Sequence, residues 1–378
     1  MNLQYTLNRF LRQFLPSPLA IAVILTFLSF LLALVFTPSP NKGLHLTQLL
    51  QFWHNGMFDS SLIEFAYQMM LILVLGHVLV LSEPMQKVFK HLLKLVSNQN
   101  SAIIVTSVFT MLAGFINWGL GLVFGAILAR KIGEHAYSNN IKINYPLICA
   151  LGYSGMLIWH GGVSGSATIK VAENGHLASL APEFSEILPA FISTAETTFS
   201  WQNLTLFVLI LLLIPMVFIV MNSKSIKTFP EYTSVLSQKF TSDSSIADSH
   251  YLDQSSWLSK GIALLIIIAV FANYSEQILQ FQLTPNFLNF SMLGLGLLLH
   301  KNLNAYSKAL QQAILGAAGI LIQFPLYFGI MGLMRDSGLI ASLSATIAQF
   351  ASAEILPVFT FISAAIVNVF VPSGGGQW

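Results

Sequence analysis

The stretch from Ala102 to Ala129 reads AIIVTSVFTMLAGFINWGLGLVFGAILA. It is apolar almost throughout and is interrupted at its centre by Asn117-Trp118-Gly119-Leu120-Gly121. Basic residues precede it at Lys87, Lys90 and Lys94 and follow it at Arg130 and Lys131. Short cytoplasmic loops of membrane proteins collect Lys and Arg, so a stretch with two basic flanks is predicted to enter and leave on the cytoplasmic side. We therefore expect a re-entrant hairpin over residues 102–130 rather than a full crossing.

The composition of the whole chain agrees with a membrane environment. The sequence is 55% hydrophobic and 8% charged, whereas soluble domains carry about 25% charged residues. The apolar runs lack the alternation of a membrane barrel, so they are predicted to cross as helices. The net charge of +2 gives no basic stripe for nucleic acid, and the single cysteine excludes an internal disulfide.

The distribution of Lys and Arg predicts a topology with a cytoplasmic N-terminus. A Ser- and Asp-rich linker at residues 223–256 is interpreted as a cytoplasmic connector between a first half, residues 1–222, and a second half, residues 257–378. The first half holds spans one to four and the hairpin, and the second holds spans five to seven and the first part of a second hairpin, whose remainder is expected to be missing. The predicted spans are Ser17–Phe36, Phe65–Leu81, Tyr145–Gly165, Leu204–Met221, Trp257–Ala272, Phe287–His300 and Ala313–Met334.

A second glycine-broken stretch lies near the C-terminal end. Val358-Phe359-Thr360 precedes Asn368 much as Val108-Phe109-Thr110 precedes Asn117. An odd span between the copies makes the second enter from the opposite face, which is typical of an inverted-topology repeat. The predicted fold is an all-α polytopic membrane protein with such a repeat and two re-entrant helical hairpins.

Transporters of this construction bind their solute near the midplane, where broken helices expose backbone groups. A third polar break, from Gly152-Tyr153-Ser154-Gly155 to Ser166, places hydroxyls and an imidazole at membrane depth, where they mark a functional site. Glycines also serve close helix packing, and that reading is favoured for Gly121 taken alone. The candidate substrate-binding residues are Asn117, Trp118, Gly119, Gly121, Ser154, His160, Gly161, Gly162, Ser164, Asn368, Ser373, Gly374, Gly375, Gly376 and Gln377.

Two kinds of coupling ion remain open. Oxygen ligands for Na⁺ would come from Asn117, Asn368 and Ser373. A coupled proton would need a titrating group such as His77 or His160, although an interhelical hydrogen bond explains His77 equally well. No other metal or cofactor is expected.

At these motifs the sequence resembles the bacterial short-chain fatty acid transporter family, within the wider ion transporter superfamily. The resemblance runs through Asn117-Trp118-Gly119-Leu120-Gly121, Trp159-His160-Gly161-Gly162 and the terminal Pro372-Ser373-Gly374-Gly375-Gly376-Gln377-Trp378. It implies a secondary active transporter, a cation-coupled symporter of acids such as butyrate or acetoacetate, with substrate and cation at paired hairpin tips. Members of the family continue past the terminal motif, so we expect the chain to be C-terminally truncated.

The resemblance also implies residence in a bacterial inner membrane, with a small monocarboxylate and the lipid bilayer as partners and no enzymatic activity. A homodimer is left open. Two alternatives remain: a transporter of another small organic anion, a dicarboxylate or acylated amino acid, and more remotely a rhomboid-like intramembrane serine protease. The latter rests on two matches to a Gly-x-Ser-Gly pattern, Gly152-Tyr153-Ser154-Gly155 and Gly162-Val163-Ser164-Gly165. It would also need a later histidine, for which His300 is the candidate.

Overall fold

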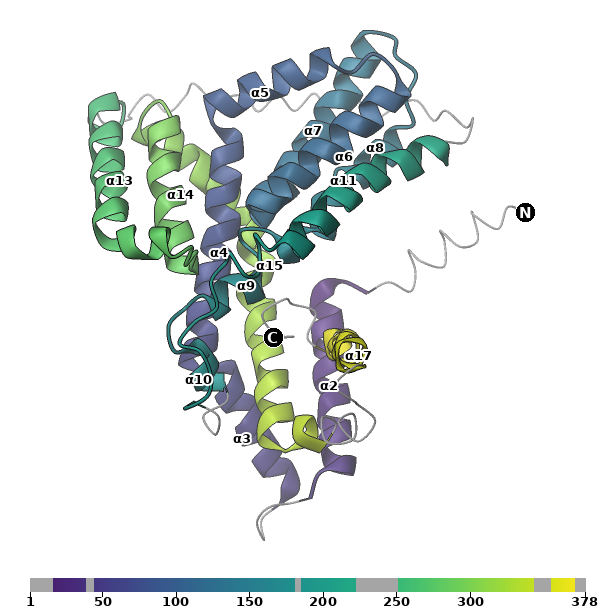
Figure 1. Ribbon diagram of the computed structural model, residues 1–378, viewed down its shortest axis with the longest axis vertical. Helices are drawn as coiled ribbons and strands as arrows, with labels where there is room; N and C mark the ends of the chain where they lie inside the picture. Colours follow the sequence, from purple (N-terminus) through teal and green to yellow (C-terminus); the bar gives the residue numbers. More distant parts are fainter. Residues whose placement is uncertain (1–15, 39–43, 181–184, 222–250, 343–354, 371–378) are drawn as a thin grey trace. The chain divides into compact units, whose positions relative to one another are not determined.

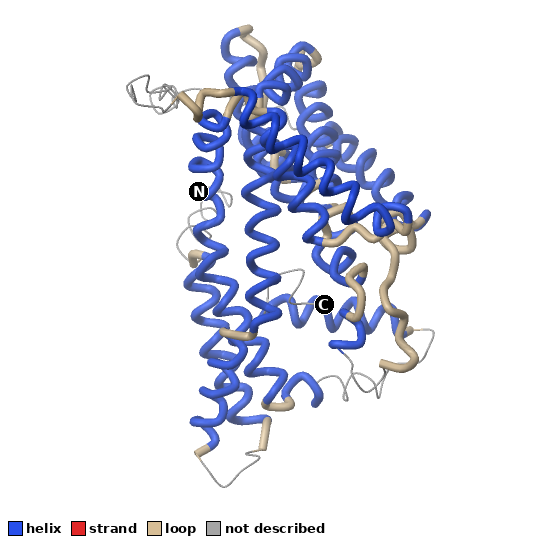
Figure 2. Tube along the Cα trace, turned by 90° about the vertical axis from the view of Figure 1, so that its left-hand side faces the viewer, coloured by secondary structure: helices blue, strands red, loops and turns tan. Residues whose placement is uncertain are grey.

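The computed structural model describes residues 16–38, 44–180, 185–221, 251–342 and 355–370. Within these ranges the chain forms helices and loops and no strand (Figures 1 and 2). This confirms an all-α polytopic membrane protein. Six described helices are long and apolar enough to cross a bilayer: Pro18–Phe36, Ser60–Leu81, Gln99–Ile116, Trp201–Val220, Ser256–Leu279 and Leu303–Asp336.

The chain groups into two compact units, residues 1–70 with 317–378, and residues 71–316. These units group residues that contact one another and do not test membrane topology. The division into halves at residues 1–222 and 257–378 therefore stays a prediction. The first unit contains α2 (Pro18–Phe36), α3 (His45–Met57), α17 (Leu356–Phe370) and parts of α4 (Ser60–Leu81) and α15 (Leu303–Asp336). There α3 packs directly on α15, because a Cβ added to Gly56 would lie 2.8 Å from the Cα of Gly332.

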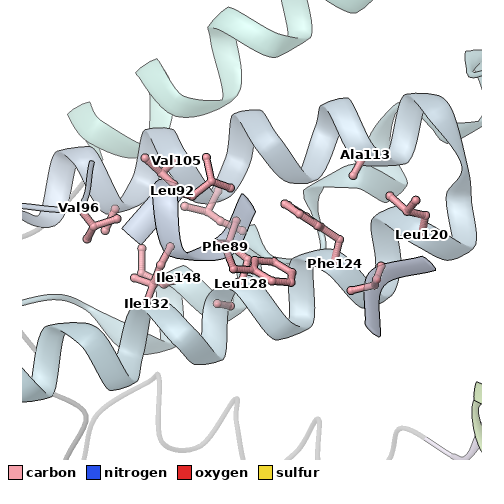
Figure 3. Packing of buried hydrophobic residues seen from close by; sticks show 14 of the residues in the cluster. Phe89, Leu92, Val96, Val105, Ala113, Leu120, Phe124, Leu128, Ile132 and Ile148 are labelled. Atoms are coloured by element: carbon pink, nitrogen blue, oxygen red, sulfur yellow. The ribbon is translucent and has the colours of Figure 1, made fainter. Parts of the chain in front are cut away.

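The second unit holds the hairpin and the polar segment. Its core is an apolar cluster from α5, α6 and α7, in which the ring of Phe89 stacks on Phe124 at 4.8 Å between centroids (Figure 3). Besides the remaining parts of α4 and α15, its elements are α5 (Glu83–Lys94), α6 (Gln99–Ile116), α7 (Trp118–Ser138), α8 (Tyr145–Leu151), the 3-10 turns η1 (Ser154–Leu157) and η2 (Trp159–Gly161), α9 (Ser166–Val171), α10 (His176–Leu180), α11 (Trp201–Val220), α13 (Ser256–Leu279) and α14 (Pro285–Leu299).

The helices α6 and α7 form an antiparallel hairpin with its turn at Asn117. The backbone of that residue is extended, with φ −154° and ψ 128°. The helix α6 ends directly before it, and α7 begins directly after it. Near the turn the backbones almost touch, since a Cβ on Gly121 would lie 2.4 Å from the Cα of Gly114. At the open end of the hairpin, away from the turn, Ala102 of α6 and Ile132 of α7 belong to the same apolar cluster. Re-entry of this hairpin from one membrane face stays a prediction.

The span predicted from Tyr145 to Gly165 contains the expected polar break, and the break takes up most of its length. The helix α8 ends at Leu151, and the chain continues as η1 and η2 before α9 begins at Ser166. The reason is tertiary: a Cβ on Gly125 of α7 would lie 1.9 Å from the carbonyl oxygen of Gly152. The segment is thus fitted backbone to backbone against the hairpin. The short helices α3 and α5 were also absent from the predicted spans.

Candidate functional site at the tip of the hairpin

Asn117 makes the turn of the hairpin with its side chain. It is 3% exposed, and its Oδ1 accepts a hydrogen bond from the backbone N–H of Leu120 at 2.7 Å. This satisfies one of the N–H groups that open α7. Its Nδ2 lies 3.2 Å from the sulfur of Met292 on α14. A single amide therefore ends α6, starts α7 and fixes the tip against a third helix.

The helix α4 meets the tip at a close backbone approach. A Cβ on Gly76 would lie 2.6 Å from the backbone nitrogen of Leu120 and 2.7 Å from Oδ1 of Asn117. On the other side of the contact, a Cβ on Gly119 would lie 2.5 Å from the Cα of Leu73. Glycine is required at both places because any side chain would push the tip away from α4.

The polar segment lies directly on the tip. The backbone N–H of Trp118 donates to the hydroxyl of Ser164 at 2.8 Å, and the N–H of Val163 donates to the carbonyl of Phe115 at 2.7 Å. Gly162 is crowded there, because its Cβ would lie 2.5 Å from that same carbonyl oxygen. The structure thus brings together Trp118, Gly162 and Ser164, which were predicted from separate motifs.

Asn203 on α11 holds the polar segment from the opposite side. Its Nδ2 donates to the carbonyls of Gly161 at 2.8 Å and Thr198 at 2.7 Å. The hydroxyl of Thr198 in turn donates to the carbonyl of Gly162 at 3.3 Å, and Thr198 is fully buried. Sequence reasoning missed Asn203, although an amide in the first turn of an otherwise apolar span is a signal that could have found it.

Buried hydrogen-bond donors remain on the hairpin, one at its tip and one two helical turns before it. The indole Nε1 of Trp118 and the hydroxyl of Thr110 are buried and have no hydrogen-bond partner among the described residues. The ring of Trp118 lies 5.9 Å from that of Trp159, which lies 3.9 Å from the imidazole of His160. Because unpaired buried donors cost free energy, these groups suit a site where a ligand or water supplies the acceptor.

The other predicted residues lie in a packing contact, beside the tip, in the first unit or outside the described residues. Gly121 packs against Gly114, which agrees with the packing interpretation. His77 is half-buried and follows Gly76 on α4, one residue from the contact with the tip. Asn368 lies exposed in α17 of the first unit, and Ser373, Gly374, Gly375, Gly376 and Gln377 lie outside the described residues.

The groups required by the protease alternative are engaged elsewhere, and the hydroxyl of Ser164 accepts from the backbone N–H of Trp118 as described above. The hydroxyl of Ser154 is 3.4 Å from the backbone carbonyl of Ser107 and donates to it. The Nε2 of His300 lies 2.9 Å from the carbonyl of Val78. Each therefore interacts with backbone in this structure, and they do not form a nucleophile and base pair. Among the residues that the structure describes, no cluster of three His, Cys, Asp or Glu side chains could hold a metal ion.

Comparison with known proteins assigns the family. The sequence profile described as "Short chain fatty acid transporter" matches residues 1–378. A protein of Escherichia coli K12, provisionally named a short-chain fatty acid transporter, is 32% identical over 380 residues, covering 98% of this chain and 81% of that protein. A protein of Haemophilus influenzae Rd with the same provisional name is 30% identical over 384 residues, with the same coverage. No solved structure matches the chain. The matched proteins are named as transporters and not as enzymes, and this chain belongs to the short-chain fatty acid transporter family.

Proposed function

We propose that this protein carries short-chain monocarboxylates, such as butyrate or acetoacetate, across a bacterial inner membrane together with Na⁺ or H⁺. The observation that carries the proposal is the hairpin tip, where Asn117 caps a new helix beside the buried indole N–H of Trp118, for which the described residues offer no acceptor. The family membership supports the class of substrate, because the matched relatives are named for short-chain fatty acids.

The depth of the tip supports a site inside the hydrocarbon. The tip touches α4 at Leu73 and Gly76, which precede the end of α4 at Leu81 by about 8 to 12 Å along a helix that rises 1.5 Å per residue. The hydrocarbon core is about 30 Å thick. Figure 1 shows the hairpin inclined to α4. Because of this inclination, the depth that the tip reaches along α4 is less than the length of the hairpin. In the proposal the hairpin is re-entrant from the cytoplasmic face, the same face as the N-terminus.

The chemistry at the tip suits a single carboxylate. The donors offered there are the indole of Trp118 and the hydroxyl of Ser164, because the backbone N–H groups of Trp118 and Leu120 already have acceptors. None of the tip contacts given above involves Lys or Arg. The start of α7 adds the positive end of a helix dipole. Burying three methylenes of the tail contributes about 2.5 kcal/mol, so we expect modest affinity and a limit on chain length. A dicarboxylate would need further donors or a cation.

The coupling ion is proposed to bind close to the same tip. Oxygen atoms suit Na⁺, and the ligand proposed within the second unit is the amide oxygen of Asn117. The assignment of Asn368 and Ser373 as further ligands stays a prediction from the sequence. If the ion is a proton, His77 and His160 are the candidate carriers. Inverted repeats of this kind support alternating access around a fixed site.

The test is uptake by the purified protein in liposomes. Labelled butyrate, acetoacetate and succinate are offered under a sodium gradient and, separately, under a pH gradient. We expect uptake of the monocarboxylates, stimulated by one of the two gradients. Preference for succinate would overturn the assignment of the substrate, and uptake that neither gradient stimulates would overturn symport.

A pair of tryptophan variants connects uptake to the tip. Trp118→Phe keeps an aromatic ring but removes the indole N–H, so KM for butyrate should rise about tenfold or more if that group binds the carboxylate. Trp257→Phe is the matched control, because Trp257 is 89% exposed and should leave KM unchanged. Equal KM values in both variants would remove Trp118 from the site.

The proposed re-entry has its own measurement. Ala102 is buried, so cysteines are placed at the exposed positions Asn100 and Tyr137, near the two ends of the hairpin, in a Cys149→Ala background. An impermeant maleimide should label both from the same face of oriented vesicles. Labelling from opposite faces would make α6 an ordinary crossing.

A further inference from the structure

The helix α5 begins where a membrane span ends. The span α4 ends at Leu81, and α5 starts two residues later at Glu83, with Pro84 in its first turn. From there α5 turns away from the axis of α4 and runs towards the open end of the α6–α7 hairpin (Figure 1). A helix that leaves a span sideways at its end lies at the level of the lipid headgroups.

One face of α5 is already occupied by protein. Phe89 is fully buried, Leu92 is 5% exposed, and both belong to the apolar core of the second unit (Figure 3). Phe89 stacks on Phe124 of α7, and Nζ of Lys131 lies 5.7 Å from the centre of the Phe89 ring. The apolar side of this amphipathic helix is therefore fixed to the hairpin.

The opposite face carries cations and exposed apolar groups together. Lys87, Lys90 and Lys94 are exposed and recur at helical spacing, so they share one side of α5. Val88, 42% exposed, and Leu95, 56% exposed, lie beside them. Because the core has taken the other apolar residues, this lysine face is the surface that α5 offers to its surroundings.

The charges on the lysine face are not neutralised by ion pairs in the described part of the chain. The ion pairs found there join Arg130 with Glu134, Lys170 with Glu173, and Arg335 with Asp336. Glu83 is the acidic residue of α5 itself and lies in its first turn, at the end nearest α4. The middle and far end of the helix thus present uncompensated positive charge.

We propose that the lysine face of α5 binds the phosphates of anionic phospholipids in the adjoining leaflet. Lysines beside exposed Val88 and Leu95 match a headgroup region, where phosphate lies directly above acyl chain. Each lysine near an anionic surface strengthens binding about fivefold, so three together contribute roughly a hundredfold. Since α5 is packed on α7, bound lipid would also hold the open end of the hairpin at the membrane surface.

The experiment titrates lipid into the purified, delipidated protein. The protein in a neutral detergent receives phosphatidylglycerol, phosphatidylcholine or inorganic phosphate, and its melting temperature is followed. The variant carries Lys87→Gln, Lys90→Gln and Lys94→Gln. The matched control carries Lys260→Gln, Lys301→Gln and Lys308→Gln, three exposed lysines of the same unit that change the charge equally.

We expect phosphatidylglycerol to raise the melting temperature of the wild type and of the control. The lipid concentration that gives half of the full increase should be nearly the same for these two proteins. In the α5 variant half-saturation should move upward by roughly a hundredfold. An equal response of the α5 variant and the control would overturn the proposal. A response of the wild type to phosphatidylcholine or to inorganic phosphate as strong as to phosphatidylglycerol would overturn it as well. Basal melting temperatures without lipid show whether each variant is folded.

Discussion

The second unit contains two helix breaks that are made in opposite ways. At Asn117 the chain changes direction within one residue, and the side chain of that residue caps the next helix. From Gly152 to Gly165 the chain forms only short 3-10 turns, and several of its glycines touch the hairpin backbone directly. The first break depends on a side chain that is present, whereas the second depends on side chains that are absent. Substitutions should therefore lower the stability of the protein by different mechanisms at the two breaks.

The largest effect is expected where the polar segment abuts α7. In Gly125→Ala the new Cβ would lie 1.9 Å from the carbonyl oxygen of Gly152 and 2.6 Å from Cγ2 of Thr110. Because the first of these atoms is backbone, the segment must shift, and we expect a loss of about 3 kcal/mol or more in stability. Thermal unfolding in detergent and the yield of monodisperse protein would measure it.

The matched control for that variant is Gly261→Ala in α13, where no described atom beyond the backbone of its own helix lies within 4 Å of the added Cβ. Replacing a helical glycine in open space should stabilise by about 0.4 to 1 kcal/mol. If Gly125→Ala were as stable as Gly261→Ala, the contrast between the two breaks would be lost.

An intermediate effect is expected at Asn203, whose side chain donates to the carbonyl of Gly161 in the polar segment and to the carbonyl of Thr198 just before α11. Asn203→Ala leaves both carbonyls without this donor and should cost about 1 to 3 kcal/mol. Asn273→Ala is the control, because Asn273 is exposed and bonds only the carbonyl of Ala269 in its own helix. Equal melting temperatures for the two variants would show that backbone contacts alone hold the segment.

The smallest effect is expected at the hairpin turn. Asn117→Ala removes the cap of α7 and should cost about 1 kcal/mol, whereas Asn117→Ser keeps an acceptor for the N–H of Leu120 and should recover most of it. Melting temperatures of the two variants measure the difference. Identical values for Ala and Ser would mean that packing on Met292, and not capping, fixes the turn.

The parts of the fold that depend on local sequence could be predicted. Apolar runs near the length of a bilayer crossing gave the spanning helices, and the polar interruption at Asn117 gave the turn of the hairpin. The neighbourhood of Trp118 and Ser164 followed from the expectation that polar groups at membrane depth gather at a site.

The parts that depend on distant partners could not be predicted. Nothing within residues 145–165 shows that the carbonyl of Gly152 meets Gly125, so hydropathy extended a span through the segment. Asn203 was missed for the same reason, because its link to the polar segment is a hydrogen bond to the carbonyl of Gly161, 42 residues earlier in the chain. The helix α5 was overlooked because its buried Phe89 and Leu92 alternate with lysines, which lowers the hydropathy of the stretch.

The bond from the Val163 N–H to the Phe115 carbonyl ties a turn of the polar segment to the last turn of α6. In a water-poor surrounding neither group finds a ready substitute partner. If the tip moved, Val163 would have to move with it, or the N–H of Val163 and the carbonyl of Phe115 would both lose their hydrogen-bond partner. The hairpin and the polar segment are thus expected to move together as one rigid body. Conformational changes of this protein would then use fewer hinges than the number of its helix breaks suggests.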